Sequence, residues 1–210
     1  MIAILDYGAG NLRSVEQGFA RVGVPTVIAT EPAQLREASG LVLPGVGAFA
    51  EAMAALRAGD LLPELLRQVE NGKPLLGICL GMQALFDSSE EGTGVQGLGL
   101  IGGQVCLLPS VTPTGRQKVP HIGWNTVSAR PDSPLFAGLP EEPYLYFVHS
   151  YACFPDDPAD IAATATYGVE FAAAVQRGHI MGMQFHPEKS GTAGKRLLQN
   201  FAKLVEGGDR

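Results

Sequence analysis

Residues 75–83 read Leu-Leu-Gly-Ile-Cys-Leu-Gly-Met-Gln. The apolar run over 75–78 predicts a short buried strand, and residues 82–86 predict the start of a helix. Between them, Gly77 and Gly81 stand two positions to either side of Cys79. A sharp turn from strand to helix strains the backbone of its central residue and leaves no space for side chains at those two positions. The stretch therefore has the form of a nucleophile elbow in which sulfur replaces oxygen.

Strands and helices alternate on both sides of this turn. Apolar runs predict strands over residues 2–5, 26–29, 41–43, 144–148, 172–175 and 180–184. Helical spacing predicts a helix after the turn at 8–11 (Leu12, Val15, Phe19, Val22), a short helix over 32–38, a helix that buries Leu61, Leu65, Leu66 and Val69, and a terminal helix with Leu197, Leu198, Phe201, Leu204 and Val205. The alternation predicts an α/β fold with a single doubly wound, mostly parallel sheet and helices on both faces.

Residues 92–143 are richer in glycine and proline than the rest of the chain, and their periodicity is weaker. This predicts loops and short strands, without a more detailed layout. No stretch has the composition of a linker, so we expect one domain over residues 1–210.

The composition favours a globular protein and argues against nucleic-acid-binding and membrane proteins. Hydrophobic residues make up 46% of the 210 residues and charged residues 17%, which is sufficient for a full core. A net charge of −6, with scattered Lys and Arg, argues against a nucleic-acid partner. The apolar runs are far shorter than the ~20 residues of a membrane helix, which argues against a membrane protein. The three cysteines lack Cys-x-x-Cys spacing, and free thiols fit a reducing cytoplasm.

Cys79 is the candidate nucleophile. It follows a predicted strand, and ligands of open α/β sheets bind at the carboxyl ends of strands. It also precedes a predicted helix, whose unpaired N–H groups favour a thiolate over a thiol. The alternative is a buried structural cysteine, because free cysteine is a common core residue and short Gly-x-Cys-x-Gly strings arise by chance.

His186 is the candidate base among four histidines. It follows the predicted strand 180–184 and precedes Pro187, which places it at the carboxyl end of another strand. Glu188 can accept a proton from the imidazole and fix its tautomer. The alternatives are a structural histidine and a solvated glutamate. A metal site would need further ligands at the spacing of known sites, which are missing, so we expect no metal and no cofactor.

Two segments could provide N–H groups for an oxyanion. One is the backbone of Leu80, directly after the nucleophile. The other is the turn over 44–47, where Gly45 and Gly47 flank Val46. These glycines would let the peptide plane at Val46 rotate between a state that points a carbonyl at the site and one that points an N–H there. The alternative is an ordinary turn.

Two motifs resemble the class I, or triad, glutamine amidotransferases. They are Gly-Ile-Cys-Leu-Gly-Met-Gln over 77–83 and Gln-Phe-His-Pro-Glu over 184–188. The resemblance extends over nearly the whole chain, through residues 6–11, 44–49, 118–125, 147–151 and 189–190. The stretch over 118–125, with its Gly-Trp-Asn, resembles in particular the glutaminase subunits of imidazole glycerol phosphate synthases in histidine biosynthesis. The family has a flavodoxin-like α/β fold.

The resemblance implies a role for each matching residue. Cys79 would be the nucleophile that forms a thioester, His186 the base and Glu188 the residue that orients it. Val46 and Leu80 would supply the oxyanion amides, and the ligand L-glutamine would be held by Gly47, Gln83, Ser150 and Tyr151. The partner would be a separate cyclase subunit with a (βα)8 barrel, in a heterodimer that receives the ammonia. The residues expected toward that partner are Asn11, Lys118, Trp124, Tyr146 and Lys189.

The sequence leaves three other interpretations of the function open. The chain could be the glutaminase subunit of another ammonia-using enzyme of the family, such as an anthranilate or aminodeoxychorismate synthase, although residues 118–125 argue against this. A stand-alone cysteine peptidase or γ-glutamyl hydrolase could use the same sheet and triad. A non-enzymatic binding module is the third alternative. For Trp124 and Tyr146, packing in the core is the simpler interpretation.

Overall fold

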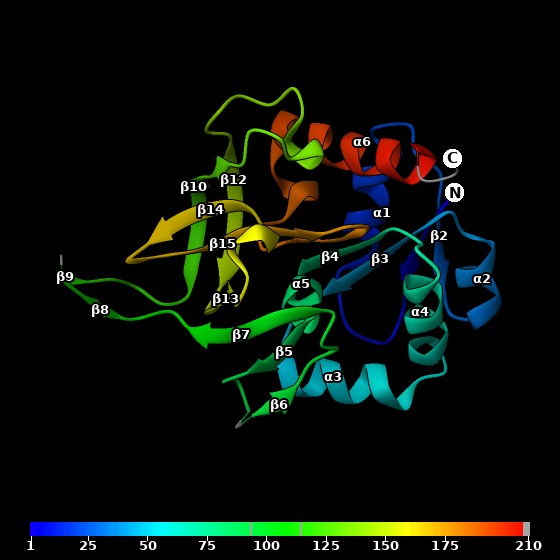
Figure 1. Cartoon of the computed structure of the whole chain (residues 1–210), viewed down its shortest axis with the longest axis horizontal. Coiled ribbons are helices and arrows are strands. Elements are labelled where there is room, and N and C mark those ends of the chain that lie inside the picture. The colour runs from blue at the N-terminus through cyan, green and yellow to red at the C-terminus, as the bar shows by residue number, and fades with distance from the viewer. Residues whose placement is uncertain (93, 114, 208–210) are drawn as a thin grey trace.

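A mixed sheet forms the centre of the molecule (Figure 1). The computed structural model of the chain describes residues 1–92, 94–113 and 115–207. Five neighbouring strands are parallel, in the order β2 (Thr26–Ala29), β1 (Ile2–Leu5), β3 (Gly40–Gly45), β4 (Leu75–Cys79) and β16 (Ile180–Met183). The predicted doubly wound core is therefore confirmed, and β4, the strand that leads to Cys79, lies inside it between β3 and β16.

The sheet continues beyond β16 with mostly antiparallel strands. In order they are β15 (Val169–Arg177), β13 (Tyr151–Pro155), β7 (Ile101–Leu107), β5 (Phe86–Ser89) and β6 (Val95–Gln96), while β14 (Ile161–Tyr167) and β11 (Ser128–Ala129) branch from β15. Only the pair β5 and β7 is parallel in this part of the described sheet. Two separate ribbons pair β10 (His121–Thr126) with β12 (Tyr144–His149), and β8 (Val111–Thr112) with β9 (Gly115–Arg116).

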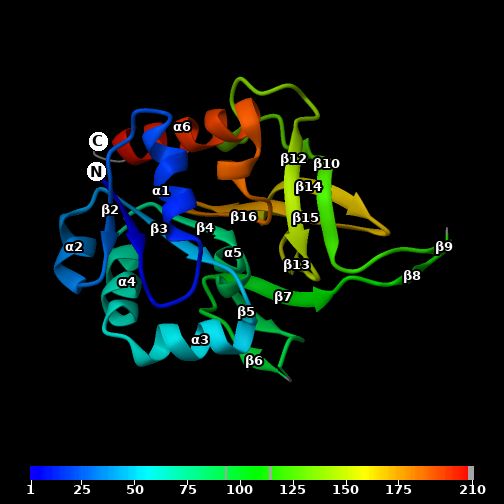
Figure 2. The same cartoon turned by 180° about the vertical axis from the view of Figure 1, so that it is seen from behind.

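Helices cover both faces of the sheet. One face carries α1 (Leu12–Ala20) and α6 (Gly191–Gly207), and the other carries α2 (Pro32–Glu37), α3 (Phe49–Ala58), α4 (Leu61–Glu70) and α5 (Leu80–Ala84). Because side chains alternate along a strand, Ile4 of β1 packs in the first core and Leu5 in the second. Figure 2 shows the same layers from behind, with the β10–β12 ribbon and the β8–β9 hairpin extending from the end of the molecule opposite to α2. The 3-10 helices are η1 (Pro134–Phe136), η2 (Pro158–Asp160) and η3 (Pro187–Lys189).

The turn at Cys79 has the strained geometry that the sequence predicts. Its φ of 55° is the only positive value at a non-glycine residue in the described part of the chain. A Cβ on Gly77 would lie 2.6 Å from the carbonyl oxygen of Gly81, and a Cβ on Gly81 would overlap the carbonyl group of Leu43. Gly45 pairs with Cys79 across β3 and β4, and a Cβ there would lie 2.8 Å from the amide nitrogen of Gly81. These glycines let β3, β4 and α5 pack with their backbones in contact.

Several predicted boundaries were wrong. The helix predicted over 82–86 begins at Leu80 and ends at Ala84, because Phe86 already belongs to β5. In α4, Leu66 is 36% exposed, whereas Glu64 is buried in an ion pair with Arg67 at 2.7 Å. Residues 44 and 45 belong to β3 instead of to a turn, and Val22 lies beyond the end of α1.

Helix α3 had no counterpart in the prediction. Five of its ten residues are alanine, so the apolar positions do not stand out as one stripe. None of the helices in the described ranges combines the length and apolar character that a bilayer span requires.

We expect Gly81→Ala to lower the free energy of unfolding by ~1–3 kcal/mol, because the added methyl group has no space against the backbone of Leu43. Urea denaturation measures this loss. Gly59→Ala is the matched control, because Gly59 has a φ of −92° and a Cβ there would lie 3.6 Å from its nearest neighbour. An equal loss in both variants would contradict the steric argument.

Candidate active site

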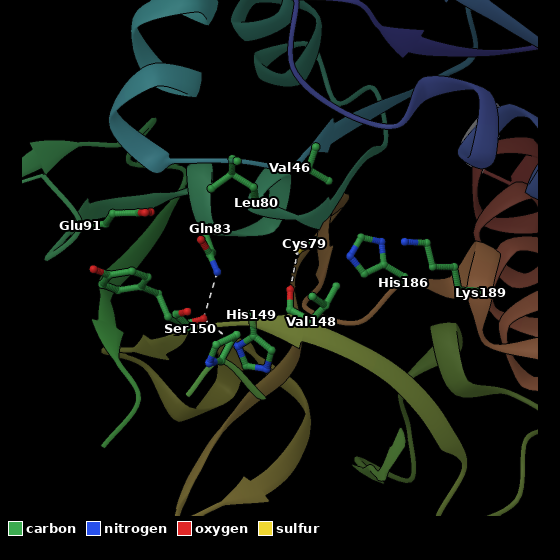
Figure 3. A pocket seen from close by; sticks show the side chains of 13 residues that line it. Val46, Cys79, Leu80, Gln83, Glu91, Val148, His149, Ser150, His186 and Lys189 are labelled. Atoms are coloured by element: carbon green, nitrogen blue, oxygen red, sulfur yellow. Dashed lines mark hydrogen bonds between the residues drawn. The ribbon is translucent and has the colours of Figure 1, made fainter. Parts of the chain in front are cut away.

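A cavity of about 370 Å³ opens at the carboxyl ends of the parallel strands. Figure 3 shows Val46 and Leu80 on one wall and Val148, His149 and Ser150 on the opposite wall, with Cys79 between Gln83 and His186. The residues that line it are Val46, Gly47, Cys79, Leu80, Gln83, Glu91, Pro120, Val148, His149, Ser150, Tyr151, His186 and Lys189. The cavity thus brings together the predicted nucleophile, base, oxyanion segments and glutamine-binding residues.

The three residues predicted to act as a triad are close together. His186 follows β16, which is the parallel neighbour of β4, so both residues lie at the same edge of the sheet. Nδ1 of His186 lies 2.8 Å from Oε1 of Glu188, and the two side chains are only 4% and 2% exposed. The other ring nitrogen, Nε2, is buried and has no hydrogen-bond partner among the residues that the structure describes. This arrangement leaves Nε2 free to exchange a proton with a group in the cavity.

The surroundings raise the pKa of His186 from 6.5 to about 9. Burial acts to lower this pKa, but the interactions of the ring with the Cys79 thiol group and with the Glu188 carboxylate outweigh it. The imidazole therefore keeps its second proton at neutral pH, and it can donate that proton to a leaving group.

The backbone of His186 is anchored to β12. Its N–H donates to the carbonyl oxygen of Tyr146 at 2.9 Å, and its carbonyl oxygen accepts from Oγ of Ser190 at 2.7 Å. The Ser190 hydroxyl also accepts from the N–H of Tyr146 at 3.0 Å. Ser190 belongs to a stretch that the sequence analysis noted, but its anchoring role depends on a contact with a distant strand and could not be seen there.

The predicted oxyanion segments lie on one side of the cavity. Leu80 is the first residue of α5, and Val46 follows the last residue of β3 with 44% of its surface exposed. Gly47 has a φ of 100°. The hydroxyl of Tyr7 donates to the carbonyl oxygen of Pro44 at 2.7 Å, and burial, together with the neighbouring Cys79, raises the pKa of this tyrosine. Tyr7 thus holds the segment that leads to Val46.

Hydrogen bonds also hold the segment of Ser150 and Tyr151, which joins β12 to β13. The carbonyl oxygen of Tyr151 accepts from Nε2 of Gln83 at 3.0 Å and from Nδ1 of His149 at 2.8 Å. Nε2 of His149 lies 2.9 Å from Nδ1 of His121. Burial lowers the pKa of His149 to about 3 and that of His121 to about 4, so both rings are neutral at pH 7. Sequence reasoning missed this pair, because β10 and β12 bring the two rings together from 28 residues apart.

The residues expected toward a partner lie mostly outside the cavity. Trp124 is 46% exposed on β10, so the interpretation of a core residue was wrong for it. Its ring stands 5.9 Å from that of Tyr146, and Nζ of Lys189 lies 5.8 Å from the centre of the Tyr146 ring. Lys189 thus links the cavity to an exposed aromatic face. Asn11 caps α1 by accepting from the N–H of Ser14, and Lys118 is exposed on the approach to β10.

Comparison with known proteins agrees with this geometry. Residues 3–205 match the model of the family described as glutamine amidotransferase class-I. The chain belongs to this family. The family members that it resembles include the imidazole glycerol phosphate synthase subunit HisH of Geobacillus sp. (strain WCH70), 49% identical over 99% of this chain and 98% of that protein. The subunit of the same name from Syntrophotalea carbinolica is 48% identical over 97% of this chain and 100% of that protein.

Solved structures of the family share the fold. A glutamine amidotransferase crystal structure matches with a TM-score of 0.75 and 21% identity, over 98% of both chains. A chain of PurLQS from Thermotoga maritima matches with a TM-score of 0.75 and 17% identity, over 97% of this chain and 98% of that one. The class I fold predicted from the motifs is confirmed. Within the described residues, no group of three His, Cys, Asp or Glu side chains is placed to hold a metal ion.

We expect a glutamine-like alkylating agent to label Cys79 well ahead of Cys106 and Cys153. Burial raises the pKa of both other thiols, that of Cys153 by a large amount, so they remain in the unreactive thiol form. Mass spectrometry of the tryptic peptides measures the labelling. Equal labelling of the three cysteines would contradict an activated Cys79.

We expect Glu188→Gln to lower the pKa of His186 from about 9, because the variant loses the carboxylate charge beside Nδ1. A raised pKa stabilises the folded state fully below pH ~6.5, and this stabilisation is lost as the pH rises through about 9. The unfolding free energy of the native chain should therefore fall between these values, and that of the variant should fall less. Nuclear magnetic resonance of the four imidazole rings measures the pKa.

The control for this measurement is Glu51→Gln, at an exposed position of α3. It should leave the titration of His186 unchanged. If Glu188→Gln also leaves that titration unchanged, the carboxylate is not what holds the proton on the ring.

Proposed function

We propose that this chain is the glutaminase subunit of imidazole glycerol phosphate synthase, which hydrolyses L-glutamine to glutamate and ammonia for a separate cyclase subunit. The observation that carries the proposal is the strained Cys79 turn in a cavity that His186 also lines, with the His186 ring bonded to the buried Glu188. Relatives named as HisH subunits, 48% and 49% identical over nearly the whole chain, support the assignment to this synthase.

The proposed reaction begins with the sulfur of Cys79. The thiolate attacks the side-chain amide carbon of glutamine, and the C=O electron pair moves to the oxygen. Backbone N–H groups of Leu80 and Val46 stabilise that oxyanion. His186 gives its proton to the amide nitrogen, the C–N bond breaks, and ammonia leaves behind a thioester. Water then attacks the thioester, His186 takes its proton, and glutamate leaves with the thiolate restored.

The remaining predicted residues would position the substrate. Ser150 lies on the wall opposite Val46, and the next residue, Tyr151, also lines the cavity, so a glutamine molecule would lie between the two segments. Nε2 of Gln83 is already bonded to the carbonyl oxygen of Tyr151, which leaves its oxygen to accept from the amino group of the substrate. Gly47 lines the cavity, and no atom lies within 4 Å of the position of an added Cβ, so the substrate carboxylate would have space beside this residue.

The proposed partner is a cyclase subunit with a (βα)8 barrel, bound as a heterodimer. It would cover the exposed aromatic face around Trp124 and Tyr146, with Asn11, Lys118 and Lys189 at the same interface. Exposed aromatic residues are enriched at protein interfaces. Ammonia would pass to the cyclase without reaching solvent.

Coupling between the subunits would act on the segment at Val46. Removing one oxyanion donor costs ~3–4 kcal/mol, or several hundred-fold in rate, so a rotation of this peptide plane would switch the reaction off. Lys189 lines the cavity and contacts Tyr146 at the aromatic face, which gives partner binding a physical connection to the site.

Two other functions differ from this one in their partner or in their substrate. A glutaminase subunit of anthranilate or aminodeoxychorismate synthase would be stimulated by a different synthase, and the HisH relatives argue against it. A stand-alone γ-glutamyl hydrolase would prefer γ-glutamyl peptides to free glutamine and would need no partner. Turnover of both substrates, with and without candidate synthases, separates the three.

We expect Cys79→Ala to abolish glutamine-dependent synthesis by the complex and to preserve synthesis from added ammonium salts. The variant loses only the ammonia source, and losing a covalent nucleophile costs many orders of magnitude in rate. Steady-state assays with each nitrogen source measure the two activities. Cys106→Ala is the matched control and should leave both unchanged. Loss of both activities in Cys79→Ala would contradict the proposed function.

We expect the chain alone to be nearly inactive on glutamine, and the partner with its ligand to raise kcat by orders of magnitude. Trp124→Ala should weaken this stimulation and leave ammonia-dependent synthesis unchanged, because it alters only the contact between subunits. A full glutaminase rate in the isolated chain would contradict the gating at Val46 and would favour the stand-alone hydrolase.

A further inference from the structure

Gln184 lies directly against the sulfur of Cys79. It follows β16 by one residue, its surface is 0% exposed, and its Nε2 stands 3.8 Å from Sγ of Cys79. Its backbone N–H donates to the carbonyl oxygen of Ala173 at 2.9 Å, which fixes it to β15. A fully buried amide in contact with a nucleophile is more than a packing residue, because each of its polar atoms needs a partner.

The orientation of this amide follows from its neighbours. The nitrogen of Gln83 must face the carbonyl oxygen of Tyr151, since a carbonyl can only accept, and the distance is 3.0 Å. Nε2 of Gln83 also lies 3.1 Å from the end of the Gln184 side chain. Because this nitrogen donates, the atom of Gln184 that it contacts must be the acceptor Oε1. The thiol of Cys153 also donates to this oxygen, at 3.9 Å. The NH2 group of Gln184 is therefore left to donate to the sulfur of Cys79.

We propose that Gln184 is a further catalytic residue, whose side-chain N–H donates a hydrogen bond to the thiolate of Cys79 and stabilises it before attack. The proposal rests on the proposed function, in which Cys79 is the nucleophile. A hydrogen bond to a charged acceptor is stronger than one to a neutral acceptor, so it favours the thiolate over the thiol.

Among the other groups at the sulfur, only His186 also favours the thiolate. The carbonyl oxygen of Val148 lies 3.9 Å away and can only accept, so it favours the thiol. Helix α5 is five residues long, which limits the contribution of its dipole. Three titratable groups face the sulfur, namely His186, Tyr7 and Cys153. Of these only His186 carries a positive charge at neutral pH, and Gln184 adds a donor that does not titrate.

The bond also connects the nucleophile to the proposed substrate site. Gln83 holds Gln184 and lines the cavity, so its position sets the direction of the donor at the sulfur (Figure 3). A chain of hydrogen bonds thus runs from the backbone of Tyr151 through two amides to the reacting atom.

The test is the pH dependence of Cys79 alkylation by iodoacetamide, measured by mass spectrometry on the full chain. In Gln184→Met, which keeps the volume and removes the donor, the pH of half-maximal alkylation should rise by about one unit, the shift expected for losing one charged hydrogen bond. Gln184→Asn provides a second variant in which the buried amide is one methylene too short, and we expect the same direction. Gln176→Met, beside Pro74 at the opposite end of β4, is the matched control and should not move the midpoint.

Kinetics of the complex with its cyclase provide the second measurement. The kcat for glutamine should fall roughly threefold to tenfold in Gln184→Met with little change in KM, because a less stabilised thiolate is scarcer but more nucleophilic. Co-elution of the variant with the cyclase in gel filtration shows that the variant folds and docks. An unchanged alkylation midpoint in both Gln184 variants would overturn the proposal, as would a rise in KM with kcat unchanged.

These outcomes separate the inference from the proposed function. The alkylation midpoint depends only on the sulfur and its neighbours, so it tests the hydrogen bond even if glutamine proves not to be the substrate. An absence of glutaminase activity in the native complex would contradict the proposed function but would not contradict the hydrogen bond from Gln184 to the sulfur.

Discussion

The strained backbone of Cys79 is the constraint on which the rest of the structure depends. A positive φ at a non-glycine residue costs ~1–3 kcal/mol and persists only where the surroundings hold it. Here β3, β4 and α5 hold it by packing backbone against backbone, which Gly45, Gly77 and Gly81 make possible. The strain turns the sulfur away from the strand and into a cavity. Leu80 follows immediately as the first residue of α5, where an N–H group has no partner within its own helix.

The mixed sheet explains how residues from distant segments reach that sulfur. Parallel strands end at the same edge, so β3, β4 and β16 deliver Val46, Cys79 and His186 to one place. The antiparallel half supplies the opposite wall, because β12 and β13 carry His149 and Tyr151 to the cavity. The parallel half of the sheet thus carries the reactive groups, and the antiparallel half forms the opposite wall of the site.

Burial sets the electrostatics of this site. His186 keeps a raised pKa of about 9 in spite of its burial, because Cys79 and the carboxylate of Glu188 favour its charged form. His149 and His121, which lack a carboxylate partner among their described contacts, have pKa values lowered by the same burial. These three histidines therefore differ in charge through their neighbours, which only the folded structure brings to them.

The sequence by itself determined the elements whose signals are local: the parallel strands, the elbow with its glycines, and the candidate residues Cys79, His186 and Glu188, which lie within short motifs. Helix α3, the layout of the short strands within 92–143 and the burial of Glu64 were not predicted, because alanine-rich helices, short strands and ion pairs carry no clear periodic signal. Only the tertiary structure decided that Trp124 faces solvent and that the Gln184 amide donates to the sulfur. Both facts depend on contacts between segments that are distant in the chain. The direction of a hydrogen bond from an amide side chain can be assigned only when the neighbours of both its oxygen and its nitrogen are known.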